Sequence, residues 1–219
     1  MIIFGLFGKT GCGKTEVLKE LKKYHPVIDI EECANTRGSV LGDLYHLKQN
    51  DQETFNKNIK NMEKEALKRN YCIVEYEGRK IGGTNKLTIP EPYSDVHKYD
   101  YKIIIECPYS QQIERLLNYY IPKNEKEKNI LISKFEMLRK VFKRMDKIKS
   151  IDEIINHIKN DNYYSAALLI EGKLYREHYI RSAYKSMPDL IIYNDNLKET
   201  VNFIDNYINK KLSERGYFG

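Results

Sequence analysis

The 219-residue sequence lacks several features that define particular classes of protein. It contains no run of 18 apolar residues, which excludes a membrane-spanning helix. Its five histidines are scattered, and its four cysteines, at positions 12, 33, 72 and 107, form no Cys-x-x-Cys pair. Neither a zinc site nor a redox pair is therefore expected. We expect reduced cysteines and a cytoplasmic protein that does not contact membranes.

We expect neither a targeting segment nor repetitive segments. An apolar run begins at residue 2, which leaves no room for a signal peptide, and there are no internal repeats or low-complexity linkers. The length suits one α/β domain with an appendage. An apolar fraction of 41% is sufficient for a buried core.

Positive charge is concentrated in one segment. The net charge is +6 and the isoelectric point about 8.9. Residues 123–149 contain ten Lys or Arg and four Asp or Glu, so this segment carries the whole excess of the chain. Such a concentration suits a polyanion such as RNA, although an ordinary solvated helix face is the alternative. The candidate RNA contacts are Lys140, Lys143, Arg144 and Lys147.

Residues 8–15 carry the most specific motif, Gly-Lys-Thr-Gly-Cys-Gly-Lys-Thr, which fits the P-loop pattern G-x-x-x-x-G-K-[ST]. Glycines let backbone N–H groups surround an anion, and the N-terminus of the following helix adds partial positive charge. Lys14 would reach the outer phosphates, and the Thr15 hydroxyl could hold a magnesium ion. Cys12 is interpreted as a small spacer. The phosphate-binding candidates are Gly8, Lys9, Thr10, Gly11, Cys12, Gly13, Lys14 and Thr15.

The spacing of apolar residues predicts an α/β fold. Short runs rich in β-branched residues predict five strands, at 2–7, 27–31, 72–76, 102–106 and 190–193. Helical patterns fall at 15–23, 52–69, 109–119 and 197–212. This alternation predicts a P-loop NTPase-like three-layer fold with a mostly parallel five-stranded sheet. The strand C-termini and the P-loop should share one edge of that sheet.

A helical insertion interrupts this alternation at residues 124–187. One apolar stripe predicts an amphipathic helix through Leu131, Phe135, Leu138, Phe142 and Met145. A second short helix is predicted at 151–158. We therefore expect a P-loop core at 1–123, a basic helical subdomain at 124–187, and a return to the core at 188–219.

Two further segments resemble a known family. Residues 28–42 read Ile-Asp-Ile-Glu-Glu-Cys-Ala-Asn-Thr-Arg-Gly-Ser-Val-Leu-Gly, and residues 74–82 read Val-Glu-Tyr-Glu-Gly-Arg-Lys-Ile-Gly, with a proline at 90. With the P-loop, they resemble the P-loop domain of tRNA 2-selenouridine synthase over roughly residues 1–120. A weaker similarity lies at 177–184.

The sequence departs from the family pattern at several positions. Thr36 stands where histidine is usual, Leu41 replaces phenylalanine and Gly78 replaces serine. Ile180 and Arg181 occupy the place of an acidic-proline pair. The rhodanese domain with which family members commonly begin does not precede the P-loop strand. The resemblance is therefore to the P-loop half of a two-chain system, with a separate rhodanese-domain partner.

The resemblance implies a two-step modification of the wobble base in the tRNA anticodon loop. The sulfur of 2-thiouridine is first geranylated from geranyl diphosphate, and selenophosphate then replaces the geranylthio group to give 2-selenouridine. The rhodanese partner is expected to serve the selenium step.

The residues are consistent with stabilisation of a departing diphosphate. We expect catalytic roles for Lys14, Arg37 and Glu75, with Arg37 contacting phosphate oxygens through its forked guanidinium. Four carboxylates at two strand ends could bind magnesium through water, orient arginines or act as bases, and the sequence leaves these roles open. The other site candidates are Asp29, Glu31, Asn35, Gly38, Ser39, Glu77, Arg79 and Lys80.

Two other functions fit the same motif. One is a P-loop kinase or NTPase acting on a nucleotide or RNA, although no strand ends in a lone aspartate of the kind typical of such enzymes. The other is a non-catalytic module that presents tRNA to a partner.

Overall fold

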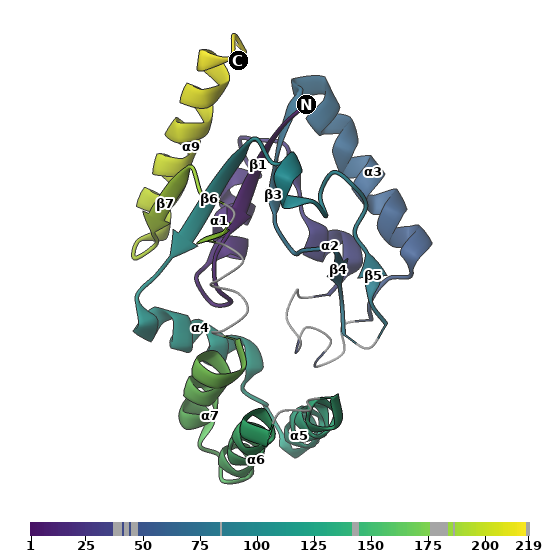
Figure 1. The fold of residues 1–219 in the computed structure, drawn as a ribbon, viewed down its shortest axis with the longest axis vertical. Coiled ribbons are helices and arrows are strands. Elements are labelled where there is room, and N and C mark those ends of the chain that lie inside the picture. Colours follow the sequence, from purple (N-terminus) through teal and green to yellow (C-terminus); the bar gives the residue numbers. More distant parts are fainter. Residues whose placement is uncertain are drawn as a thin grey trace.

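A five-stranded parallel sheet forms the centre of the molecule (Figure 1). The computed structural model describes residues 1–36, 41, 44, 48–83, 85–141, 145–175, 184–185 and 187–217. The strand order is β2-β3-β1-β6-β7, and all four pairings are parallel. The strands are β1 (Ile2–Phe7), β2 (Val27–Ile28), β3 (Tyr71–Glu75), β6 (Tyr101–Glu106) and β7 (Leu190–Tyr193). The predicted P-loop α/β fold with a five-stranded sheet is confirmed.

The helices and a small second sheet complete the fold. Antiparallel strands β4 (Lys80–Ile81) and β5 (Leu87–Thr88) form a two-stranded sheet that the sequence analysis missed. Two short segments are the 3-10 helix η1 (Val96–Lys98) and the π-helix η2 (Ile170–Tyr175). The helices are α1 (Lys14–Leu21), α2 (Ile30–Ala34), α3 (Gln52–Arg69), α4 (Tyr109–Tyr120), α5 (Glu125–Val141), α6 (Met145–Lys159), α7 (Tyr163–Leu169) and α9 (Leu197–Glu214).

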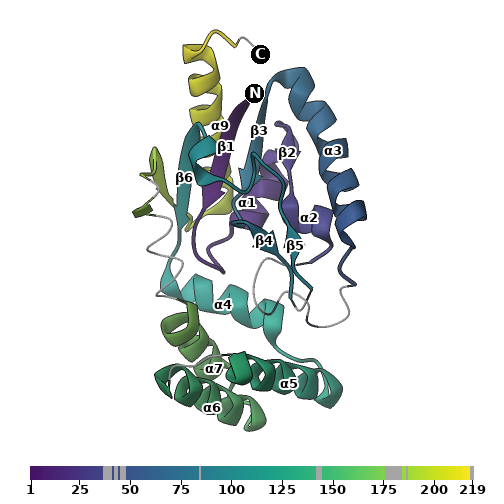
Figure 2. The ribbon, with the colours of Figure 1, turned by 45° about the vertical axis from the view of Figure 1, so that its right-hand side comes forward.

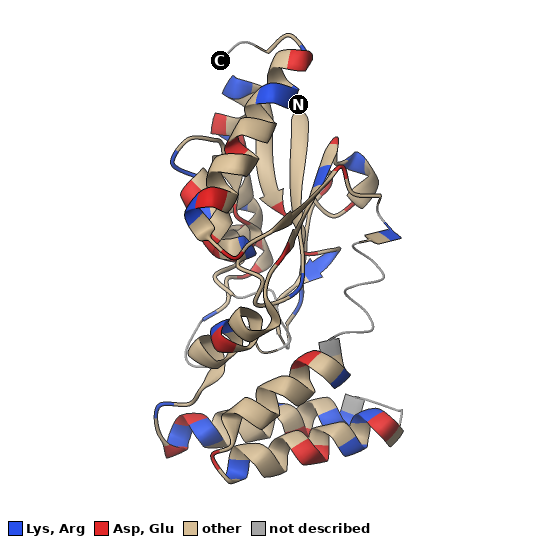
Figure 3. Ribbon diagram, turned by 90° about the vertical axis from the view of Figure 1, so that its left-hand side faces the viewer, with Lys and Arg blue, Asp and Glu red and all other residues tan. Residues whose placement is uncertain are grey.

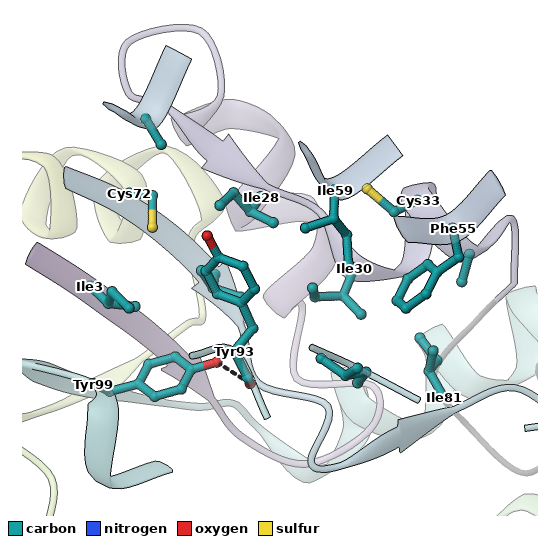
Figure 4. Close-up of a cluster of buried hydrophobic side chains, with 14 of the residues drawn as sticks. Ile3, Ile28, Ile30, Cys33, Phe55, Ile59, Cys72, Ile81, Tyr93 and Tyr99 are labelled. Atoms are coloured by element: carbon teal, nitrogen blue, oxygen red, sulfur yellow. Dashed lines mark hydrogen bonds between the residues drawn. The ribbon is translucent and has the colours of Figure 1, made fainter. Parts of the chain in front are cut away.

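Both faces of the sheet are buried because successive side chains of a strand point to opposite faces. In β1, Ile3 and Phe7 pack on the face covered by α2 and α3. Phe4 and Leu6 pack on the other face, against α1 and α9. Figure 4 shows the first of these clusters, where the Tyr99 hydroxyl donates to the Tyr93 carbonyl oxygen at 2.8 Å. The continuous apolar strand sequences follow from this two-sided burial.

The strand predicted at 27–31 is shorter than expected. β2 ends at Ile28, and Asp29 is the N-cap of α2. The Asp29 carboxylate accepts a hydrogen bond from the Glu32 N–H at 2.8 Å. An aspartate cap followed by two acids in the first turn stabilises a helix start, so the chain turns into α2 instead of extending the strand. The prediction that Glu31 lies at a strand end was wrong.

The segment between α4 and β7 packs around a core of its own. Phe135 of α5, Ile154 and Ile158 of α6, and Ala166 of α7 form one cluster. Figures 1 and 2 show α5, α6 and α7 gathered beyond α4, at the opposite end of the molecule from the N- and C-termini. This cluster explains the apolar stripe, while the proposed domain limits stay a prediction.

The stripe does not continue through one helix as predicted. Leu131 and Phe135 are buried, but α5 ends at Val141 and Met145 begins α6 with an exposure of 67%. Phe142 lies outside the described residues. The helix predicted at 151–158 is the buried face of the longer α6. Among the described residues, no helix is both long and apolar enough to cross a membrane.

Candidate phosphate-binding site

The P-loop joins the end of β1 to the start of α1, at the carboxyl edge of the sheet. Gly13 is the N-cap residue of α1 and has a φ of 85°. A Cβ at this position would lie 2.4 Å from Nδ2 of Asn194. Glycine is thus required by both the backbone angle and the close approach. The strand, loop and helix arrangement predicted from the motif is present, with the helix N-terminus available to an anion.

Lys14 and Thr15 both contact Glu75, at the end of neighbouring β3. The Lys14 Nζ lies 3.4 Å from Glu75 Oε1, and the Thr15 hydroxyl donates to Glu75 Oε2 at 3.3 Å. Lys14 also donates to the carbonyl oxygen of Lys9 at 3.2 Å. Lys14 and Glu75 are buried, at 6% and 4% exposure. A charged lysine is therefore held at the loop by a buried carboxylate, ready to exchange that partner for a phosphate.

Burial raises the pKa of Glu75, while the Lys14 charge opposes this rise. The pKa of the half-buried Glu77 is raised well above its usual range by burial and by the charges of Glu75 and Glu31. Burial likewise raises the pKa of Asp29, whose charge acts on Glu75. The predicted carboxylate cluster is thus present, although Glu31 joins it from a helix.

A magnesium ion fits the chemistry of the donors but would need further ligands. The Thr15 hydroxyl and the Glu75 carboxylate supply the oxygen atoms that Mg²⁺ prefers. In the part of the chain that the structure describes, no group of three or more His, Cys, Asp or Glu is arranged to hold a metal ion. Magnesium would therefore bind here with phosphate oxygens and water completing its shell.

Three polar side chains that the sequence analysis missed hold consecutive carbonyl groups of the loop. Gln112 donates to the Thr10 carbonyl oxygen at 2.8 Å, and Arg115 to that of Gly11 at 3.3 Å. Asn194, directly after β7, donates to that of Cys12 at 3.0 Å. These bonds fix the orientation of the peptide groups in the loop, and hence of their N–H groups. No local sequence signal marks these residues, because the contacts form only in the folded chain.

The helical segment also contacts the loop. Lys9 Nζ lies 3.3 Å from Oε1 of Glu171, a residue of η2 that is 3% exposed. The P-loop and the segment beyond α4 are therefore joined by an ion pair. The Tyr184 hydroxyl donates to the Glu106 carboxylate at the end of β6.

The remaining predicted site residues fall into three groups. Asn35 is the C-cap of α2, and its side chain donates to the Lys48 carbonyl oxygen at 2.9 Å, which is a structural contact. Arg79 and Lys80 are exposed at the start of β4. Arg37, Gly38 and Ser39 lie outside the described residues, as do Lys143 and Arg144.

One predicted RNA contact is incompatible with the structure. Lys147 is 5% exposed, and its ammonium group donates to the carbonyl oxygen of Lys173. Its side chain is directed into the helical cluster because α6 turns that face toward η2. Lys140 is exposed on α5, and its contact with RNA stays a prediction. Figure 3 shows that Lys and Arg alternate with Asp and Glu over these helices.

A glycine loop between the first strand and first helix, with Lys14 and Thr15 at the helix start, defines a P-loop α/β protein. The chain belongs to the family described as the tRNA 2-selenouridine synthase AAA domain, whose model matches residues 1–205.

Relatives agree with this assignment. The chain is 60% identical over 98% of its length to an uncharacterized protein of Methanocaldococcus jannaschii, of which it covers 94%. It is 28% identical over 76% of its length to a tRNA 2-selenouridine synthase of Nitrosomonas eutropha, and spans 42% of that protein. The synthase of Nitrosomonas europaea is 30% identical over 52% of this chain and is covered to 29%. The chain therefore spans less than half the length of these synthases.

Two solved structures show a low overall similarity to this chain. The Thermus thermophilus protein TT1252 matches 96% of this chain and is covered to 97%, with a TM-score of 0.42 and 13% identity. Shikimate kinase from Bacteroides thetaiotaomicron matches 95% and is covered to 98%, with a TM-score of 0.37 and 16% identity.

Proposed function

We propose that this chain is the P-loop subunit of a cytoplasmic tRNA 2-selenouridine synthase. It would geranylate the wobble 2-thiouridine and convert it to 2-selenouridine together with a separate rhodanese-domain chain. The observation that carries the proposal is the contact of Lys14 and Thr15 with Glu75 beside a glycine loop, in a chain of this family. That arrangement suits a substrate whose leaving group is a diphosphate.

The first step needs charge stabilisation more than a protein nucleophile. The sulfur of 2-thiouridine attacks the allylic carbon of geranyl diphosphate, a C–S bond forms, the C–O bond breaks, and the base loses its N3 proton. Negative charge develops on the departing diphosphate, where the loop N–H groups and Lys14 would stabilise it. In the second step selenophosphate replaces the geranylthio group, for which we assign the partner chain a role.

One substitution in the P-loop tests the role of Lys14 in this step. Lys14→Ala should lower the yield of S-geranylated nucleoside by about 100-fold or more, because the developing charge loses its buried cation. The measurement is mass analysis of nucleosides after incubation with 2-thiouridine tRNA and geranyl diphosphate. Lys19→Ala, which changes an exposed lysine of the same helix, is the matched control. Equal yields from the Lys14 variant and the unchanged chain would refute the leaving-group role.

We further propose that RNA binds along one face of α5. This face of α5 borders an open hollow of about 720 Å³, and no acidic residue is among the described residues that line it. The hollow is lined by Leu44, Lys126, Asn129, Ile130, Ser133, Lys134 and Met137. Its charge and mixed polarity suit an RNA strand.

This surface predicts a specific loss of tRNA affinity. Lys126→Glu with Lys134→Glu should weaken binding and reduce the slope of log affinity against log salt by about two. The matched control reverses two exposed lysines of α3, Lys64→Glu with Lys68→Glu, at the same cost in net charge. Binding is measured by fluorescence anisotropy over a salt series. An equal loss in both double variants would mean that only net charge matters.

A second function, a P-loop kinase or NTPase, is favoured by one observation. The Asn194 side chain is 1% exposed, and its Oδ1 has no hydrogen-bond partner among the described residues. The Asn194 side chain borders Gly13, with Arg115 close by, so this unsatisfied acceptor lies beside the loop that would hold the phosphates of a nucleotide. ATP hydrolysis without a geranyl adduct would support this function. Neither activity, with tRNA still bound, would support a non-catalytic module.

A further inference from the structure

Two cysteines that are 95 residues apart in the sequence meet at the P-loop. Cys12 lies in the loop itself, and Cys107 follows directly after β6. The Cys107 thiol donates to the Cys12 sulfur, with 3.3 Å between the two Sγ atoms. Cys107 Sγ is also 3.8 Å from the carbonyl oxygen of Gly11. The sequence spacing gave no reason to expect a redox pair, yet the fold brings these two sulfur atoms into contact.

The two sulfur atoms differ in character from the remaining cysteines. The hydrogen bond from Cys107 lowers the pKa of Cys12 to about 7, against the effect of burial and with help from Lys14 and Lys9. The same hydrogen bond and burial raise the pKa of Cys107. Cys33 and Cys72 lie in the apolar cluster under α3, where burial raises the pKa of each to about 12. Of the four cysteines, only Cys12 has both a stabilised thiolate and the thiol of another cysteine in contact with it.

We propose that Cys12 and Cys107 are a reversible modification site, a dithiol that a low-molecular-weight disulfide oxidises, and that the resulting cross-link prevents the P-loop from binding its anion. Cys12 is 3% exposed, whereas Cys107 is half-buried, so Cys107 meets the oxidant first. This inference goes beyond the proposed function, because it concerns the loop whatever diphosphate or nucleotide it binds.

The chemistry balances as two thiol–disulfide exchanges. The Cys107 proton passes to Cys12, and the Cys107 thiolate attacks one sulfur of the external disulfide, whose S–S bond breaks to release one thiolate. Cys12 then loses its proton to solvent and attacks Cys107 Sγ, which releases the second thiolate. The pair, which begins as one thiol and one thiolate, loses two electrons and its single proton, and the external disulfide gains the two electrons and leaves as two thiolates that take up protons from solvent.

Oxidation would distort the loop because its backbone is closely held. An S–S bond is about 2.05 Å long, so the sulfur atoms must approach by about 1.3 Å from 3.3 Å. The Cys12 N–H donates to the Lys9 carbonyl oxygen at 3.2 Å, and its own carbonyl oxygen accepts from Asn194 at 3.0 Å. A shift of Cys12 therefore disturbs the peptide groups that face an anion. By linkage, a bound anion must disfavour the cross-link to the same extent.

The cross-link can be mapped on the unmodified full chain. The reduced protein is incubated with excess oxidised glutathione, free thiols are alkylated, and the chain is digested without reductant. We expect the loss of two hydrogen masses, one cross-linked peptide pair containing Cys12 and Cys107, and reversal by dithiothreitol. Inorganic pyrophosphate should slow its formation. Free thiols at both positions, a lasting glutathione adduct, or pairing with Cys33 or Cys72 would overturn the proposal.

The effect on the loop is measured by calorimetric titration with inorganic pyrophosphate. Affinity should fall by at least about tenfold on oxidation and return on reduction. The Cys107→Ser variant should keep its affinity for pyrophosphate in the presence of oxidant, and Cys107→Ala replaces it if the serine variant fails to fold. The control variant Cys33→Ser still has both loop cysteines and should lose affinity for pyrophosphate on oxidation. Unchanged affinity in the cross-linked protein would overturn the switch. If the reduced protein fails to transfer a geranyl group while the cross-link still forms and weakens pyrophosphate binding, the result counts against the proposed function alone.

Discussion

At the scale of single residues, the buried ion pair between Lys14 and Glu75 couples anion binding to stability. Lys14→Met should destabilise the protein by about 3–5 kcal/mol at pH 8, because a buried carboxylate loses its partner. The pKa of Glu75, already raised by burial, rises further without the lysine. Because the pKa of this carboxyl group is higher in the folded than in the unfolded protein, protonation stabilises the folded state. The loss of unfolding free energy caused by Lys14→Met should therefore become smaller as the pH falls to 5. Urea denaturation at both pH values measures this.

The double variant Lys14→Met with Glu75→Gln is the control for that measurement. It removes both charges, so it should recover most of the stability at pH 8 while still failing to bind pyrophosphate. A double variant as unstable as Lys14→Met would show that the Glu75 charge is not the cause.

Gly13 gives a second prediction at this scale. Gly13→Ala should cost more than the roughly 1–2 kcal/mol of a left-handed alanine, because its Cβ would also meet Asn194 Nδ2 at 2.4 Å. Gly78→Ala is the matched control, since Gly78 has a φ of 79° and no atom within 4 Å of an added Cβ. Thermal unfolding and pyrophosphate titration compare them. Equal stability losses would mean that the contact with Asn194 has no energetic weight.

At the scale of elements, the sequence predicted those helices and strands whose burial leaves a local pattern of apolar residues. β1 and β7 have the predicted bounds because their apolar runs are bounded by turns. α2 was missed because the apolar residues after Pro26 suit a strand or a helix, and the Asp29 cap decides between them. The contacts of Gln112, Arg115 and Asn194 with the loop could not be foreseen, because they join segments that only the fold brings together.

At the scale of the whole molecule, the ion pair of Lys9 with Glu171 links the loop to the helical segment. A bound diphosphate would compete with Glu171 for the Lys9 ammonium. Glu171→Gln should therefore raise pyrophosphate affinity about twofold to fivefold, within the range of an ion pair worth up to about 1 kcal/mol. Titration calorimetry measures the change.

Asp161→Asn is the matched control for this prediction. It removes one negative charge from the same helical segment, where Asp161 is 2.7 Å from Lys128 and does not contact the loop. The same gain in both variants would attribute the effect to net charge and would contradict a specific link through Lys9.

The bonds from α4 and from the residue after β7 to the loop carbonyls have a consequence for any attempt to shorten this protein. The motif lies at residues 8–15, yet its shape depends on side chains contributed more than ninety and more than one hundred and seventy positions later. An N-terminal fragment would contain the complete motif sequence, but its loop would lack the side chains that orient the peptide groups and would bind an anion weakly. Pyrophosphate affinity in a truncation series should thus return only once the last strand has been restored, which makes this ligand a reporter of completed folding.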